Sequence, residues 1–192
     1  MQLKLYTCLS VLLAALFCAP ATAQDIGMYN SPKGVGAQFR FSEHDGIFHT
    51  ATAFVDIYGV MTSRCQYPGY RFNFSRQYIF KKLEHDDVRM TLYAGPGVSF
   101  GYVHDHDKGR KLFDIQSLIA NNDGFMFAVS GDVGCRFDFG KRIALDLSFT
   151  ADAGLHVRRN EKEKTYQAAS LSIYNNGLLQ ALYPQLTILF KL

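Results

Sequence analysis

The fold is decided by residues 143–157, which read IALDLSFTADAGLHV. Every second residue of this run is apolar, and the residues between are mostly polar or small. An unbroken period of two predicts a β-strand, and this one is longer than the five or six residues usual in sheets. Asp146 and Asp152 share the polar face, while the other face is hydrocarbon. Such a strand suits a barrel with lipid outside and a polar lumen inside.

The same alternation recurs along the chain and predicts eight strands. They lie near residues 25–29, 35–41, 47–58, 67–81, 89–102, 125–139, 143–157 and 182–192. The first is assigned because an even number of strands puts both ends of the chain on the same side. Short and long links alternate between the strands, as they do in outer-membrane barrels. The predicted fold is all-β, an eight-stranded antiparallel transmembrane up-and-down β-barrel.

The chain opens with the features of a secretory signal peptide. Lys4 precedes an apolar run at residues 11–17, and Ala21 and Ala23 form a small-x-small cleavage site. We therefore expect residues 1–23 to be a signal peptide and residues 24–192 to be an outer-membrane β-barrel domain. The remaining charge is close to neutral, which argues against a nucleic-acid partner.

Charged residues on the polar parity predict a filled lumen rather than an open pore. An eight-stranded barrel leaves an interior that side chains just fill, and charges are tolerated there when they are paired. The predicted lumen ion-pair network consists of Arg40, Asp56, Arg71, Arg89, Asp132, Arg136, Asp138, Asp146 and Asp152. We expect each of the four arginines in this set to pair with one of its five aspartates. Arg76 alone has the outward parity, where an arginine costs about 2–4 kcal/mol at the membrane midplane unless a bulge near Ser75 turns it inward or it snorkels.

Several runs resemble a known class of barrels. Residues 68–75 (PGYRFNFS), 93–97 (YAGPG) and 101–103 (GYV) are similar to the outer-membrane β-barrel proteins common in Bacteroides relatives. The whole mature chain resembles the small OmpA/OmpX-type barrels of Gram-negative bacteria, a porin-like family. The last strand resembles the C-terminal signal read by the barrel-assembly machinery, with Leu186, Ile188, Phe190 and Leu192 on its apolar face. It ends in leucine where that class has an aromatic residue.

Two groups of residues suggest chemistry. His104, Asp105, His106 and Asp107 alternate metal-ligand types at the start of a long loop, but a solvated polar loop explains them more simply. His156 and Asp152 share an inward face, as in lipid-modifying barrel enzymes, with Ser99 and Ser130 lying deeper. A hydrogen-bonded lumen histidine is again the simpler interpretation, and we expect no cofactor, metal or catalytic residue.

The predicted function is that of a monomeric, non-enzymatic barrel of the cell outer membrane. Its outer loops would serve surface interaction or envelope integrity, and its partners would be outer-membrane lipid and the barrel-assembly machinery. Two alternatives stay open. One is a lipid-modifying outer-membrane enzyme that uses rim His and Asp residues. The other is a soluble lipocalin-like binding barrel, which has the same alternation with the apolar face inward.

Overall fold

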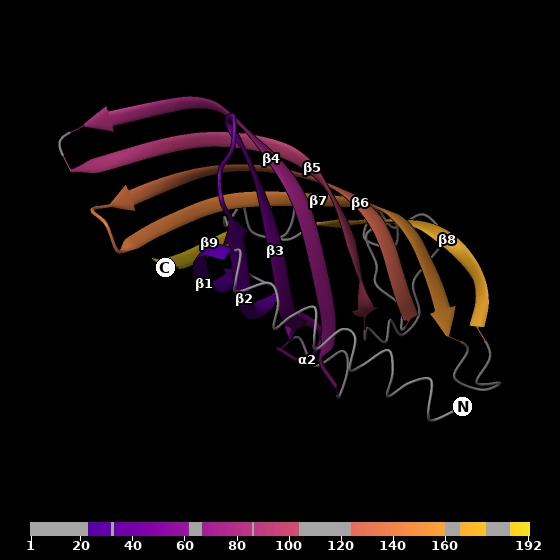
Figure 1. Cartoon of the computed structure of the whole chain (residues 1–192). Coiled ribbons are helices and arrows are strands. Elements are labelled where there is room, and N and C mark those ends of the chain that lie inside the picture. Colours follow the sequence, from indigo (N-terminus) through magenta and orange to yellow (C-terminus); the bar gives the residue numbers. More distant parts are fainter. Residues whose placement is uncertain are drawn as a thin grey trace, which may run out of the picture.

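The protein is an all-β, eight-stranded closed antiparallel barrel (Figure 1). The computed structural model describes residues 23–31, 33–61, 67–85, 87–103, 124–159, 166–175 and 185–192. The strands are β1 (Ala23–Ser31), β2 (Gly34–Phe41), β3 (Ile47–Asp56), β4 (Gly69–His85), β5 (Val88–Val103), β6 (Gly124–Phe139), β7 (Ile143–Arg159), β8 (Tyr166–Asn175) and β9 (Gln185–Lys191). A four-residue helix, α2 (Tyr58–Met61), follows β3. Across the described ranges, no helix is long and apolar enough to cross a membrane.

Nine strand segments fill eight positions because the last position is interrupted. β7 pairs with β6 along one edge. Along its other edge it pairs with β9 through residues 143–148 and with β8 through residues 151–159. β8 and β9 run in the same direction, one after the other, and β9 closes the barrel against β1. The expected strand at 182–192 is therefore β9, and β8 is a segment that alternation alone did not assign.

The strands are steeply tilted. Following the paired residues from Tyr29 through β2, β3, β4, β5 and β6 leads to His156 on β7. Following them from Tyr29 through β9 leads to Asp146, ten residues away on the same strand. This offset between the two routes is the stagger that closes a tilted barrel, with strands at about 35–45° to the axis.

The two ends of the barrel differ. The short links between β2 and β3, β4 and β5, and β6 and β7 lie together at one end, which we call the turn end. The Leu192 amide donates to the Gln24 carbonyl at 2.9 Å, so the start of β1 and the end of β9 also lie there. The hairpins of β4–β5 and β6–β7 extend furthest past the short strands β1–β3 (Figure 1). The segment 25–29, assigned from topology, is confirmed as part of β1.

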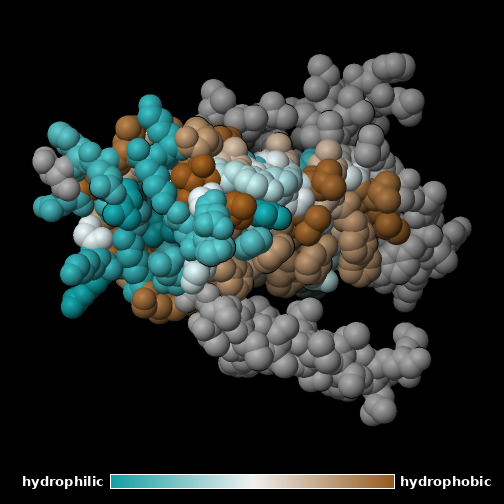
Figure 2. Space-filling view, turned by 45° about the horizontal axis from the view of Figure 1, so that its top comes forward, coloured by the Kyte–Doolittle hydropathy of each residue, from teal (hydrophilic) through white to brown (hydrophobic). Residues whose placement is uncertain are grey.

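Polar side chains lie inside the barrel and apolar side chains lie outside, which is the reverse of the usual arrangement in a soluble protein. Most buried side chains are polar or charged, among them Arg71, Gln77, Asp146 and Thr187. Large apolar side chains face outward around the wall, and Val129 is 66 % exposed. Figure 2 shows apolar residues over the middle of the visible face and hydrophilic residues gathered at one end. Six residues were expected to be exposed on the outside, and Ile143 is exposed while the other five are partly exposed: Leu145, Leu147, Phe149, Leu186 and Ile188.

Arg76 does lie on the outer face, and no bulge near Ser75 turns it inward. The pairing of β4 with β5 stays regular at Ser75 and shifts between Ile79 and Lys81 instead. The Arg76 guanidinium carbon lies 5.3 Å from the centre of the Tyr78 ring, two residues nearer the turn end. This geometry fits an arginine that extends along the wall over an aromatic ring.

Candidate functional site

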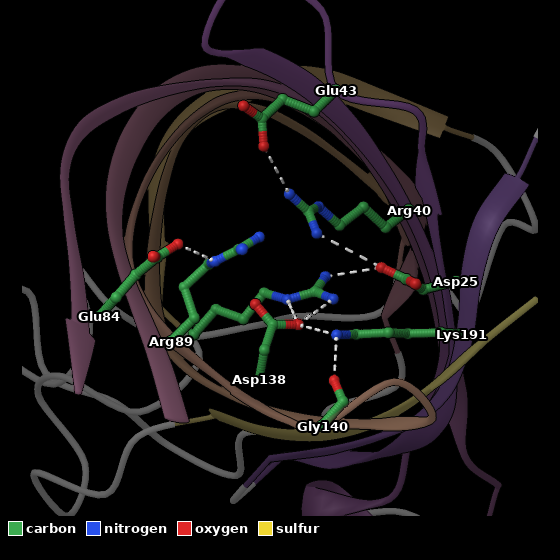
Figure 3. A network of polar contacts seen from close by, with 9 residues as sticks. Asp25, Arg40, Glu43, Glu84, Arg89, Asp138, Gly140 and Lys191 are labelled. Atoms are coloured by element: carbon green, nitrogen blue, oxygen red, sulfur yellow. Dashed lines mark hydrogen bonds and ion pairs between the residues drawn. The ribbon is translucent and has the colours of Figure 1, made fainter. Parts of the chain in front are cut away.

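The most highly organised group of polar side chains lies in the lumen at the turn end. Seven side chains form a chain of alternating charge, which we call the mouth ladder; Figure 3 labels its members Glu43, Arg40, Asp25, Asp138 and Lys191. In order, they are Lys82, Glu43, Arg40, Asp25, Arg136, Asp138 and Lys191. Each of the three carboxylates contacts two cations, so the ladder begins and ends with a positive charge.

Strand pairing and strand closure together bring the ladder into one place. Asp25 is paired with Arg40 on one side and with Lys191 on the other, so three inward side chains lie at one level. Arg136 reaches them from β6, which is 111 residues further along the chain than Asp25. Only a closed barrel puts β6 opposite β1, and the local sequence of either strand carries no sign of this contact.

Asp25 is the centre of the ladder. Its Oδ2 atom accepts from Arg136 Nη1 at 2.6 Å and lies 3.4 Å from Arg40 Nη1. The Asp25 side chain is 1 % exposed, and both arginines are nearly as buried. Removing one member of such a buried group leaves an uncompensated charge. The Arg40 guanidinium also lies 4.2 Å from the centre of the Phe48 ring, which fixes its position against the wall.

Neutral and acidic groups fill the lumen above the mouth ladder. Tyr93 donates its hydroxyl to Asp146 at 2.6 Å, and Gln77 donates to Asp132 at 2.8 Å. Thr187 on β9 donates to Gln38 on β2 at 2.7 Å, over the inner face of β1, which lies between them. The Phe48 ring packs edge-on against Tyr93, with centroids 5.1 Å apart. These contacts link inward side chains of next-but-one strands around the barrel.

A second charged group lies farther from the turn end, toward the opposite end of the barrel. Arg71 donates to Asp152 at 2.5 Å, and Ser99 donates to the other oxygen of Asp152 at 2.8 Å. Asn73 donates to both Ser99 and Ser130 at 2.9 Å. The group joins β4, β5, β6 and β7 through one continuous set of hydrogen bonds.

The structure places most of the predicted lumen charges inside the barrel, and two of the four arginines pair with an aspartate of the predicted set. Arg71 pairs with Asp152, and Arg136 pairs with Asp138. The buried members are Arg40, Asp56, Arg71, Asp132, Arg136, Asp146 and Asp152, while Asp138 is half-buried.

The predicted partners of two arginines were wrong. Arg40 pairs with Asp25 and Glu43 rather than with a predicted aspartate. Arg89 is exposed at the rim and pairs with Glu84 at 2.6 Å, because β4 and β5 continue past the lumen and carry this pair with them. Asp146 and Asp132 bind Tyr93 and Gln77, as described above, and not an arginine. The alternation of Ile26 and Met28 with Asp25 was the signal that could have added Asp25 to the network.

Among the described side chains, the residues considered for catalysis do not form a catalytic triad. Ser99 contacts Asp152, but Asp152 is engaged by Arg71. His156 is four residues further along β7, about 13 Å at the usual rise of a strand, and its side chain lies outside the described part. The metal candidates His104, Asp105, His106 and Asp107 also lie outside the described residues. Within the residues that the structure describes, no group of three His, Cys, Asp or Glu side chains could hold a metal ion.

Gly134 leaves space for the ring of Tyr93 inside the barrel. A Cβ atom at Gly134 would lie 2.3 Å from the Tyr93 ring, whereas one at Gly131 on the same strand would meet nothing within 4 Å. We expect Gly134→Ala to displace Tyr93 from Asp146 and to lower the free energy of unfolding by about 1–3 kcal/mol. Gly131→Ala is the matched control and should change it by less than about 1 kcal/mol. Urea unfolding followed by tyrosine fluorescence measures both; equal midpoints for the two variants would contradict the packing described here.

Comparison of the chain with family models, with curated proteins and with solved structures found no match in any of the three.

Proposed function

We propose that the protein is an integral β-barrel of the bacterial outer membrane with a side-chain-filled lumen and no enzymatic activity. The single observation that carries this proposal is the reversed distribution of side chains. A belt of exposed apolar residues surrounds a lumen of buried arginines, aspartates and hydroxyl groups. Monomeric soluble proteins rarely expose apolar patches larger than a few hundred Å², while a bilayer accepts such a surface.

The inside of the barrel argues against the soluble binding alternative. A lipocalin-like barrel needs an apolar interior that holds a ligand, whereas this interior is occupied by the hydrogen bonds of Asp132, Asp146 and Asp152. The enzyme alternative has less support because Asp152, its central residue, is neutralised by Arg71. The loops at the end away from the turns would then serve surface interaction or envelope integrity, since rigid scaffolds commonly present functional loops.

The proposed partners follow from the wall of the barrel. Membrane lipid would contact the apolar belt, and the barrel would work as a monomer. The last strand would carry the signal for the barrel-assembly machinery. Leu186, Ile188, Phe190 and Leu192 lie on or just after β9, and none of them is buried.

Gel mobility tests the proposal directly. Outer-membrane fractions from cells that express the full chain would be run with and without boiling. A folded membrane barrel resists detergent and migrates faster before boiling, so two bands are expected. A single band, together with recovery of the protein in the soluble fraction, would contradict the proposal.

Conductance tests the filled lumen. The wild-type barrel in planar bilayers should conduct far less than an open porin, because paired side chains cross the lumen at three levels. Single-channel recording measures this, with a known porin in the same bilayer as the positive control. Steady conductance of porin size would contradict a filled lumen without contradicting membrane insertion.

A further inference from the structure

A cavity of about 280 Å³ opens at the turn end, beside the mouth ladder. Its walls come from the barrel strands and the short turns at this end. Six cationic and three acidic side chains line it. They are Arg40, Lys82, Arg89, Arg136, Lys141 and Lys191, with Asp25, Glu43 and Asp138.

The acidic side chains of the cavity are already engaged. Each of the three bridges two cations of the mouth ladder, as described above, and Arg40 and Arg136 are buried within those contacts. The lining therefore has more positive charge than its own carboxylates balance. This excess favours an anion as the occupant, since an added cation would face six positive side chains.

Arg89 provides a free hydrogen-bonding edge toward the cavity. It contacts Glu84 through Nε at 2.6 Å, and within the described residues its two Nη nitrogens have no hydrogen-bond partner. Figure 3 shows the Arg89 side chain pointing into the opening of the barrel. Lys141 lines the same cavity, also without a partner in the described part of the chain. The buried hydroxyl group of Thr91 completes this side of the wall.

We propose that this cavity binds a phosphate-bearing anion, with Arg89 and Lys141 as its main ligands. An arginine fork matches two oxygens of a phosphate, and such charge-assisted hydrogen bonds are stronger than neutral ones. A phosphate carries up to two negative charges and further acceptor oxygens, which suits the remaining lysines and the threonine. The volume admits a phosphate group with a small substituent, either a free phosphomonoester or the headgroup of a lipid.

The binding test uses the full barrel refolded in maltoside micelles, which contain no phosphorus. One arm adds inorganic phosphate, and the other adds phosphatidylglycerol to the micelles as the sole phosphate. Phosphorus NMR then follows line broadening and shift of the ligand signal as the protein is titrated. Binding in the first arm identifies a free ligand, and binding in the second arm alone identifies a headgroup. Either result supports the site, and no effect in both arms overturns it.

Three variants locate the binding. Arg89→Gln should weaken phosphate binding by about tenfold or more, since it removes a bidentate charged donor. Arg142→Gln is the matched control, because Arg142 is an exposed turn arginine outside the cavity lining. Glu84→Gln should strengthen binding about threefold by freeing Arg89 Nε from its ion pair. Equal binding by the wild type and Arg89→Gln would overturn the assignment.

The same samples are run unboiled on a gel. A folded barrel that binds no phosphate refutes the cavity proposal and leaves the proposed membrane function standing. A protein that binds phosphate but shows no faster-migrating band before boiling refutes the membrane function and leaves the cavity proposal standing. The two proposals therefore fail separately.

Discussion

Asp25→Asn is expected to lower the free energy of unfolding of the barrel by about 3–5 kcal/mol, as does breaking other buried ion pairs. The substitution keeps the shape of the side chain and removes its charge. Arg40 and Arg136 would then share no central carboxylate, although both stay buried in the mouth. Two buried like charges would face each other, and only Glu43 and Asp138 would remain to neutralise them.

Urea unfolding of barrels refolded into lipid vesicles measures this effect. Glu84→Gln is the matched control, because it also removes one carboxylate from an arginine pair at the same end of the barrel. That pair is exposed, with the two side chains 56 % and 66 % accessible, so the loss should stay below about 1 kcal/mol. If the two variants unfold at the same urea concentration, the buried ion pairs of Asp25 do not stabilise the barrel more than the exposed pair does.

The strands were predictable from sequence because each residue of a barrel wall faces either outside or inside. Because of this constraint, apolar and polar residues alternate along long segments such as β7. Alternation over a strand of 17 residues is not typical of any other secondary structure. β8 was harder to predict because its apolar and polar residues alternate poorly. Among the described strands, it pairs with β7 alone. A bulge near Ser75 was one of two explanations left open for Arg76, and the register shift of β4 lies between Ile79 and Lys81 instead, because a bulge depends on the partner strand as much as on its own residues.

The pairs inside the lumen were less predictable than the strands. Parity shows which side chains point inward, but the partner across the lumen depends on the stagger of the whole barrel. Arg71 and Asp152 lie on strands that do not pair with each other, and the sequence predicted only that each arginine would pair with one of five aspartates, not which one. Glu43 was missed because it lies in a turn, where alternation carries no information.

Placing an arginine on the wall distinguishes a membrane setting from an aqueous one. Val133 lies near the middle of β6 and Phe139 at its turn end, and both face outward with 48 % exposure. In a bilayer, Val133→Arg should lower the free energy of unfolding by about 2–4 kcal/mol, and Phe139→Arg by about 0–1 kcal/mol. In water, both substitutions would be ordinary surface changes within about 0.5 kcal/mol.

The comparison is made by urea unfolding in lipid vesicles, with the two variants and the wild type refolded under the same conditions. The two side chains lie on the same strand, face outward and are equally exposed. A difference in the free energy of unfolding between the two variants therefore reports depth in the membrane rather than loss of packing alone. Arg76→Leu adds a test of opposite sign, since removing a natural outward arginine should stabilise the barrel where lipid covers it. A flat response across all three positions would mean that water, and not lipid, surrounds the apolar belt.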